Sequence, residues 1–238
     1  MKVFSLKGLL IVMAVWWLML IPGCNQAKPL DPLLKGLIAH FAYENNVKDS
    51  SGNNYDAEAH GNPSYVAGVI GHALFLDGKD DWLILAKRSH LLNGDFTISM
   101  WVSYGPQSFG SGYSALFIQS TEKNAPWDGV SIFARPSILA RLDGLHPLIS
   151  KFSNMADSDT WHYLSLVKEG DKLSLYIDGK LDKSITATHK KIIKPSSIFI
   201  GANHIDQKIQ NYKGKIDELR IYDRALGASE IQKLFELK

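Results

Sequence analysis

Apolar and polar residues alternate along most of the chain between Leu37 and Tyr222, and clusters of Gly, Asn, Asp and Pro separate the alternating stretches. A period of two is typical of β-strands with one buried face. We expect strands over residues 36–43, 72–77, 81–86, 95–104, 113–120, 129–134, 160–170, 171–180, 196–202 and 214–226. Ten short strands separated by frequent turn signals predict an all-β protein, either a sandwich or a jelly roll.

The stretch DFTISMWV shows the alternation most clearly. One set of positions holds Phe96, Ile98, Met100 and Val102, and the intervening set holds Thr97, Ser99 and Trp101. One of the two sets should face the space between the sheets. For Trp101 and Trp161 we take a buried core position as the first interpretation, with stacking against a ligand as the alternative.

Turns and one helix complete the predicted elements. EGDK at 169–172 and IDGKL at 177–181 are typical of tight hairpin turns, in which Gly supplies a positive φ. Ser229 is expected to cap a helix over EIQKLFEL, with Ile231, Leu234 and Phe235 on one face. Residues 105–126 are rich in Gly, Ser and polar side chains, which predicts a long loop around one strand.

The first residues have the form of a secretion signal. Lys2 and Lys7 precede an uncharged, largely apolar stretch from Leu9 to Ile21. A helix needs about 20 such residues to cross a bilayer, so a permanent membrane span is the weaker interpretation. The order Leu20, Ile21, Pro22, Gly23, Cys24 resembles the lipobox of bacterial lipoproteins, which implies cleavage after Gly23 and lipidation of Cys24. The alternatives are an ordinary signal peptide with an incidental cysteine, or a short signal-anchor.

Lipidation would explain the single cysteine of the chain. Several acyl chains together hold a protein on a membrane, where one alone does so weakly. We therefore expect a signal peptide over residues 1–23, a lipidated tether over 24–35 and one exported domain over 36–238, which has no disulfide because the only thiol is used. Asn25 in place of Asp is compatible with sorting to an outer membrane, as part of an extracytoplasmic location in the cell envelope.

Charge narrows the range of partners. Without residues 1–23 the chain loses Lys2 and Lys7 and carries 24 basic against 24 acidic side chains. A neutral chain without a basic stripe argues against a nucleic-acid partner.

Six stretches together resemble the laminin-G-like group of the concanavalin A-like lectin and glucanase superfamily. They follow the order of that family and are LIAHFAYENNVKDSSGNNYDAEAHG (37–61), YVAGVIGHALFLDGKDDWLIL (65–85), GDFTISMWV (94–102), TWHYLSLVKEGDKLSLYIDGKL (160–181), IFIGA (198–202) and GKIDELRIYDRALGASEI (214–231). The resemblance implies a two-sheet antiparallel jelly-roll sandwich of the concanavalin A-like type, here with a short C-terminal helix.

The same resemblance implies a structural Ca²⁺ ion, held by oxygen ligands from distant parts of the chain. The matching positions are Glu44, where the family usually has Asp, together with Asp49 and Asp217. In the alternative, Asp49 begins an Asx turn and Asp217 bonds nearby amides. Asp80 and Asp81 fit a hairpin turn in DGKDD better than a second metal site.

Catalysis is not expected. Retaining glycosidases need two carboxylates about 5–5.5 Å apart, and the laminarinase-type relatives place them in an alternating Glu-x-Asp-x-Glu pattern. None of the seven glutamates stands in that pattern, and there is no Ser/His/Asp elbow, HExxH motif or cysteine nucleophile. Asp128 with Asp143 is the best pair that a hydrolase could use.

The region from Tyr113 to Arg141 has the composition of a sugar-binding surface. Sugar rings pack their C–H faces on Trp or Tyr, and their hydroxyls need polar partners. The candidate ligand-binding residues are Trp127, Asp128, Tyr113, Arg135 and Arg141, with Trp127 in the loop NAPWDG as the best single candidate and a lid over the core as its alternative. The sequence therefore predicts a membrane-anchored, non-catalytic carbohydrate-binding domain, and a protein-binding adhesive or structural surface lipoprotein is the alternative.

Overall fold

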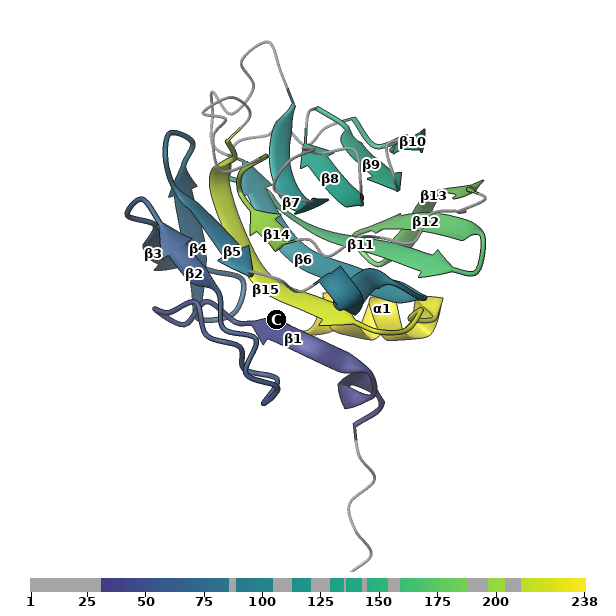
Figure 1. Ribbon diagram of the computed structural model, residues 1–238, viewed down its shortest axis with the longest axis horizontal. Coiled ribbons are helices and arrows are strands. Elements are labelled where there is room, and N and C mark those ends of the chain that lie inside the picture. The colour runs from purple at the N-terminus through teal and green to yellow at the C-terminus, as the bar shows by residue number, and fades with distance from the viewer. Residues whose placement is uncertain are drawn as a thin grey trace, which may run out of the picture. The chain divides into compact units, whose positions relative to one another are not determined.

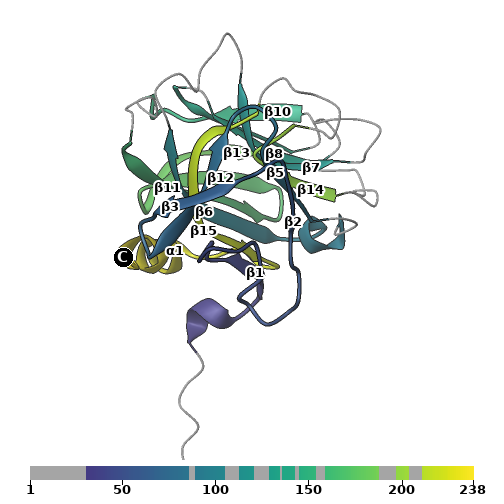
Figure 2. The same cartoon turned by 90° about the vertical axis from the view of Figure 1, so that its left-hand side faces the viewer.

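A computed structural model describes residues 31–85, 89–104, 113–120, 129–134, 136–142, 145–153, 159–187, 197–203 and 211–238. The chain divides into two units, Met1–Asp31 and Pro32–Lys238. Every helix and strand of the described residues belongs to the second unit. Two antiparallel sheets face each other in this unit, as Figures 1 and 2 show from two directions. The predicted two-sheet jelly-roll sandwich is confirmed.

Eight strands form one sheet, called sheet A. The first seven run in the order β13 (Lys180–Thr186), β12 (Lys172–Ile177), β11 (Trp161–Glu169), β6 (Phe96–Tyr104), β15 (Lys213–Tyr222), β4 (His72–Asp77) and β3 (Ser64–Ala67). The eighth, β1 (Leu37–Phe41), pairs with the end of β15 that β4 leaves free. β15 thereby joins the first strand of the unit to the middle of the sheet.

Seven strands form the other sheet, called sheet B. Their order is β10 (Leu145–Ile149), β9 (Ile138–Leu142), β8 (Val130–Ala134), β7 (Ser114–Ser120), β14 (Ser197–Ile200), β5 (Trp82–Leu85) and β2 (Glu58–His60). Short 3₁₀ helices span Pro32–Leu34 (η1) and Ser89–Leu92 (η2).

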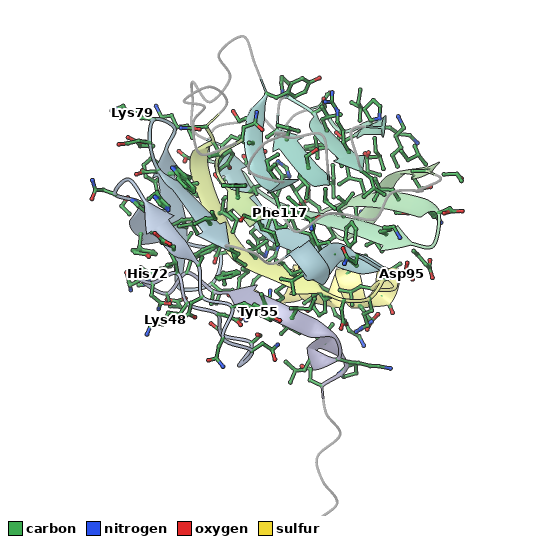
Figure 3. All side chains as sticks on the ribbon, viewed as in Figure 1. Lys48, Tyr55, His72, Lys79, Asp95 and Phe117 are labelled. Carbon is green, nitrogen blue, oxygen red and sulfur yellow. The ribbon has the colours of Figure 1, made fainter. Side chains whose placement is uncertain are left out.

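The main core lies between the sheets. Phe96, Ile98, Met100 and Val102 of β6 all belong to it, so the alternation in DFTISMWV is confirmed. Phe117 of β7 is fully buried there, and Figure 3 shows it in the interior, whereas Lys79 and Asp95 lie at the periphery. Burial of this continuous apolar layer is the main favourable contribution to folding in a unit without a disulfide among its described residues.

A second core lies on the outer face of sheet A, under helix α1 (Ala228–Glu236). Ile231 and Leu234 of the helix pack against Trp101 and Tyr163, which supports the buried interpretation of Trp101. Trp161 is half-buried against the same cluster. The prediction that Ser229 caps this helix is wrong. Gly227 is the N-cap, and the Glu230 carboxylate at the third helical position accepts the N–H of Gly227 at 2.9 Å, which is the reciprocal half of a capping box.

The two hairpin turns are confirmed, whereas several strands were missed. Glu169 pairs with Lys172 and Ile177 with Lys180, which leaves two-residue turns in both places. The second turn begins a separate strand, β13, that the predicted strand 171–180 did not include. Strands β2, β3, β9 and β10 were also missed. Three of these, β2, β3 and β10, lie at sheet edges, and β2 and β3 contain no buried position that would give an apolar alternation.

The stretch DGKDD does not form the expected hairpin turn. It joins β4 of sheet A to β5 of sheet B, so these strands do not pair with each other. Asp81 is buried, and its carboxylate accepts the N–H groups of Asn62 at 2.7 Å and Asp77 at 3.0 Å. This residue fixes the passage of the chain from one sheet to the other.

None of the helices among the described residues combines the length and apolar character that crossing a membrane requires. Cys24 and the predicted signal segment 1–23 lie outside the described residues.

Candidate functional site

The outer face of sheet B carries a third apolar cluster, away from the space between the sheets. In β8, Val130, Ile132 and Ala134 point into the main core, while Ser131 and Phe133 point outward. Neighbouring strands add outward apolar residues, and the cluster consists of Ile84, Ala115, Ile118, Phe133, Leu139 and Phe199, with Trp82 and Tyr113 packed against it. The alternation that builds the core therefore also gives sheet B an apolar cluster on its outer face, and the six members of this cluster are buried, whereas Trp82 and Tyr113 are half-buried.

Five ring side chains, called the aromatic row, lie on this face over the neighbouring strands β8, β7, β14, β5 and β2. They are Phe133, Tyr113, Phe199, Trp82 and His60. The ring centroids of Tyr113 and Phe133 are 5.9 Å apart, as are those of Trp82 and Phe199, and His60 stacks flat on Trp82. Phe133 and Phe199 are buried, whereas Tyr113, Trp82 and His60 keep part of their surface in solvent.

Polar groups flank the aromatic row at both ends. Arg141 of β9 is half-buried and pairs directly with Ser131 of β8, so both side chains lie on the outer face. At the other end, Glu58 of β2 is on the same face as His60, with 3.5 Å between its Oε1 and the histidine Nε2. An arrangement of half-exposed rings between a guanidinium and a carboxylate can pack an apolar ring face and bond its hydroxyl groups.

The structure brings two of the five predicted ligand-binding residues onto this face, namely Tyr113 and Arg141. Trp127, Asp128 and Arg135 lie outside the described residues. Trp82 and His60 were missed. The period-two pattern of DWLILA places Trp82 opposite the core-facing Leu83 and Leu85, so this pattern could have identified the tryptophan. The three-residue strand β2 gave no comparable signal for His60.

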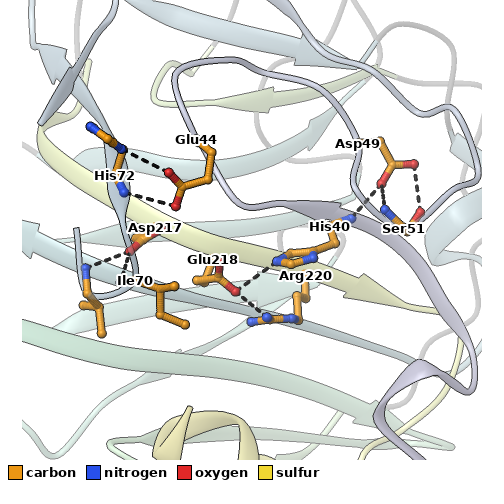
Figure 4. Close-up of polar contacts among 10 residues, drawn as sticks. His40, Glu44, Asp49, Ser51, Ile70, His72, Asp217, Glu218 and Arg220 are labelled. Atoms are coloured by element: carbon orange, nitrogen blue, oxygen red, sulfur yellow. Dashed lines mark hydrogen bonds and ion pairs between the residues drawn. The ribbon is translucent and has the colours of Figure 1, made fainter. Parts of the chain in front are cut away.

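The predicted metal ligand Asp49 is fully engaged by hydrogen bonds (Figure 4). Its Oδ1 accepts the N–H of His40 at 2.9 Å and of Ser51 at 2.8 Å. Its Oδ2 accepts the Ser51 hydroxyl at 2.8 Å and the Tyr55 N–H at 3.0 Å. Burial alone would raise the pKa of Asp49, but these donors outweigh it and lower the pKa below its usual value.

The other two predicted ligands, Glu44 and Asp217, both hold the turn before β4. Glu44 accepts the His72 N–H at 3.1 Å and contacts the His72 ring through Nδ1 at 3.0 Å. The Asp217 Oδ2 accepts the N–H groups of Val69 at 2.8 Å and Ile70 at 3.1 Å. These are the contacts of the alternative in which the acids bond nearby amides.

The second oxygen of the Asp217 carboxylate takes no part in these contacts. Its side chain is fully buried, and its Oδ1 has no hydrogen-bond partner among the described residues. Burial raises the pKa of Asp217 to about 6, opposed by the N–H of Ile70 and supported by the negative charge of Glu218. Glu218 differs, because His40 and Arg220 both contact its carboxylate, as Figure 4 shows, and overcome the effect of burial to lower its pKa.

A cation at Glu44, Asp49 and Asp217 stays a prediction. Within the described ranges, the group of three acids with ligand atoms within 4.8 Å of one another is Asp77, Asp80 and Asp81, which includes none of them. Asp49 already accepts four hydrogen bonds, so a cation bound there would replace some of these donors.

A family comparison decides the identity of the fold. The model of the concanavalin A-like lectin/glucanases superfamily matches residues 77–232. The chain belongs to this superfamily. The matched range begins at the end of β4 and includes sheet B apart from β2, so the superfamily core carries most of the aromatic row.

Similar proteins of this superfamily fold include binding domains. The chain is 24% identical to Paraclostridial mosquitocidal protein 1 of Paraclostridium bifermentans in an alignment of 208 residues, which covers 79% of this chain and 16% of that protein. The crystal structure of the binding domain of that protein superposes with a TM-score of 0.70 and 22% identity, covering 85% of this chain and 52% of the domain. The chain thus spans about half of that domain.

Two further solved structures share the fold. Domain 4 of AbnA, an extracellular arabinanase from Geobacillus stearothermophilus solved in complex with arabinotriose, has a TM-score of 0.64 and 23% identity. That alignment covers 84% of this chain and 98% of the domain. The binding domain of botulinum neurotoxin DC, in complex with rat synaptotagmin II, has a TM-score of 0.68 and 20% identity over 85% of this chain and 52% of that domain.

Proposed function

We propose that the unit Pro32–Lys238 binds a glycan, without altering it, through the aromatic row on the outer face of sheet B. The observation that carries this proposal is the pair of half-exposed rings Trp82 and Tyr113, which stand between Arg141 and Glu58. Aromatic faces accept the C–H face of a sugar, while a guanidinium donates to hydroxyl oxygens and a carboxylate accepts from hydroxyl groups. Trp127, Asp128 and Arg135, which the sequence indicates as ligand-binding residues, are also part of this proposal.

The comparison with AbnA domain 4 supports a sugar as the ligand. That domain matches this chain over 98% of its length and was solved with arabinotriose. A whole domain of this size and fold therefore accommodates a short saccharide. The proposal includes no catalytic step, in keeping with relatives that are binding domains and with the absence of the Glu-x-Asp-x-Glu pattern from the sequence.

A protein partner is the second candidate. The neurotoxin domain was solved with synaptotagmin II, and this chain covers 52% of that domain. In this form the protein would act as an adhesive or structural surface lipoprotein.

The proposal also includes an extracytoplasmic membrane anchor through a lipidated Cys24, which the sequence predicts. Arg224 donates to the carbonyl oxygens of Lys35 at 2.7 Å and Pro32 at 3.0 Å, and it also bonds Glu230 of α1. The unit therefore begins beside α1, on the sheet A side, whereas the aromatic row lies on the outside of sheet B.

A glycan array tests the proposal. The full chain in detergent would be compared with the Trp82→Ala and Trp127→Ala variants, with calcium and again with chelator. Trp161→Ala is the matched control, because it removes a half-buried tryptophan from the opposite sheet. We expect Trp82→Ala to weaken binding that Trp161→Ala retains in full. Equal binding by these two variants would contradict the proposal.

A further inference from the structure

A recess lies on the sheet A side, where the β12–β13 turn meets α1. Its volume is about 480 Å³, within the range of roughly 300–1,000 Å³ for small-molecule sites. Its lining combines four apolar side chains with four polar ones. None of these residues belongs to the aromatic row or to the predicted ligand-binding set.

Two rings in the lining are held in place by contacts with other ring side chains. Phe235 of α1 packs against Trp101 with ring centroids 5.4 Å apart, and Phe152 meets the ring of His162 edge-on at 4.9 Å. Leu181 stands at the rim and is 52% exposed although it is apolar. A ligand with an apolar face would cover surface that is otherwise left in water.

Two carboxylates in the recess are fixed before any ligand arrives. Asp182 accepts the N–H groups of Lys151 at 2.8 Å and Phe152 at 3.1 Å. Asp178 accepts the Tyr163 N–H at 2.9 Å and the Nδ1–H of His162 at 2.9 Å. A carboxylate has about four acceptor sites, so each retains capacity for a further donor at a fixed position.

Donors stand beside these acceptors. Lys180 is exposed and forms no ion pair with the residues that the structure describes. Gln232 of α1 donates one of its two amide hydrogens to Glu236 at 2.8 Å and keeps the other. The β12–β13 turn lies close to this amide. A Cβ atom added to Gly179 would be only 2.3 Å from the Gln232 Oε1.

We propose that this recess is a second carbohydrate site, which takes a neutral sugar ring. The C–H face of the sugar packs on Phe235, its hydroxyl groups donate to Asp178 and Asp182, and Lys180 donates to a hydroxyl oxygen. The two carboxylates disfavour an anion, and a ligand that also accepts a bond from Lys180 needs oxygen acceptors, so a neutral polyol with an apolar face uses both the acceptors and the donor of the recess. This site is separate from the aromatic row and does not depend on it.

Two sites on opposite sheets would let one molecule contact two saccharide chains, or two parts of one chain. Binding at both raises the strength of attachment to a polymer without any new contact.

Nuclear magnetic resonance of the full chain in detergent tests the recess directly. The probes are arabinotriose, cellotriose and chitotriose, and the signals are the methyl groups of Leu181 and the indole N–H of Trp82. We expect at least one probe to shift the Leu181 methyl signals. Lys180→Ala should raise the Kd obtained from that shift about tenfold, as expected for the loss of one charged hydrogen bond. Lys172→Ala is the matched control, since Lys172 is an exposed lysine at the far end of the same hairpin.

The outcomes separate the two sites. A Leu181 shift that Lys180→Ala weakens and Lys172→Ala retains supports the recess, whatever happens at Trp82. A shift at Trp82 alone overturns the recess and leaves the aromatic row standing. The recess is also overturned if no probe shifts the Leu181 signals. A Leu181 shift that both lysine variants retain in full has the same meaning.

Discussion

His60 lies flat on Trp82, with ring centroids 3.8 Å apart and an angle of 1° between the ring planes. The pair joins β2, at the edge of sheet B, to β5. A stacked pair contributes about 0.5–1.5 kcal/mol beyond the area it buries. We expect His60→Ala to lower the free energy of unfolding by about 1 kcal/mol in a urea titration. Glu58→Ala, which removes a side chain that is 73% exposed on the same strand, is the control and should change little. Equal effects of the two substitutions would contradict a stabilising stack.

Protonation of Asp217 should stabilise the fold. Burial raises its pKa from 3.8 to about 6, so the native state holds this proton more tightly than the unfolded chain does. The stabilisation is therefore complete below about pH 4 and is lost as the pH rises through about 6. A shift of about two units corresponds to ~3 kcal/mol. Urea titrations across this range should show the decline in the natural chain and a flatter profile for Asp217→Asn, and an unchanged slope in the variant would exclude this origin.

Asp49 should behave in the opposite way. Its donors lower its pKa, so its contribution is present above the unfolded pKa and is lost as the pH falls through the lowered value. Asp49→Asn leaves some of the four donors without an acceptor, which should cost about 1–3 kcal/mol at neutral pH. Thermal melting with calcium and with chelator checks the cause. We expect the same loss in both, whereas a loss seen only with calcium would assign Asp49 to a metal.

Arg224 should hold the first residues of the unit in place. Its guanidinium bonds two backbone carbonyls near η1 and pairs with Glu230 of α1. Arg224→Ala should therefore lower the stability by about 1–3 kcal/mol and speed amide hydrogen exchange at Leu37 and its neighbours in β1. Unchanged exchange in β1 would show that strand pairing with β15 alone secures this end. Lys233→Ala, on the exposed side of α1, is the control.

The fold followed from the sequence wherever a strand has one buried face. The alternation in β6 placed Phe96 and Met100 in the core, and Asp178–Gly179 indicated the turn between β12 and β13. Both predictions were possible because each feature depends on local geometry. Strands β2 and β3 were missed because they are three and four residues long and contain no buried position. The capping of α1 was misplaced because a glycine N-cap carries no side-chain signal, and the helix start is secured by Glu230 three residues later.

The candidate site was harder to predict than the fold. Tyr113 and Arg141 were identified from residue type, and the structure places both on one face. Trp82 and His60 meet across two strands, and this contact depends on the pairing of β2 with β5, which no local pattern encodes. The recess beside α1 is harder still to predict from the sequence, since its walls come from the β10–β11 connection, the β12–β13 hairpin and the helix.

Calorimetric titration of the full chain with arabinotriose, and with any saccharide identified on the array, tests the central claim most directly. The natural chain should bind, Trp82→Ala should weaken binding by about tenfold or more, and Trp161→Ala should bind as the natural chain does. Binding that is equally strong in the natural chain and in Trp82→Ala would contradict glycan recognition by the aromatic row.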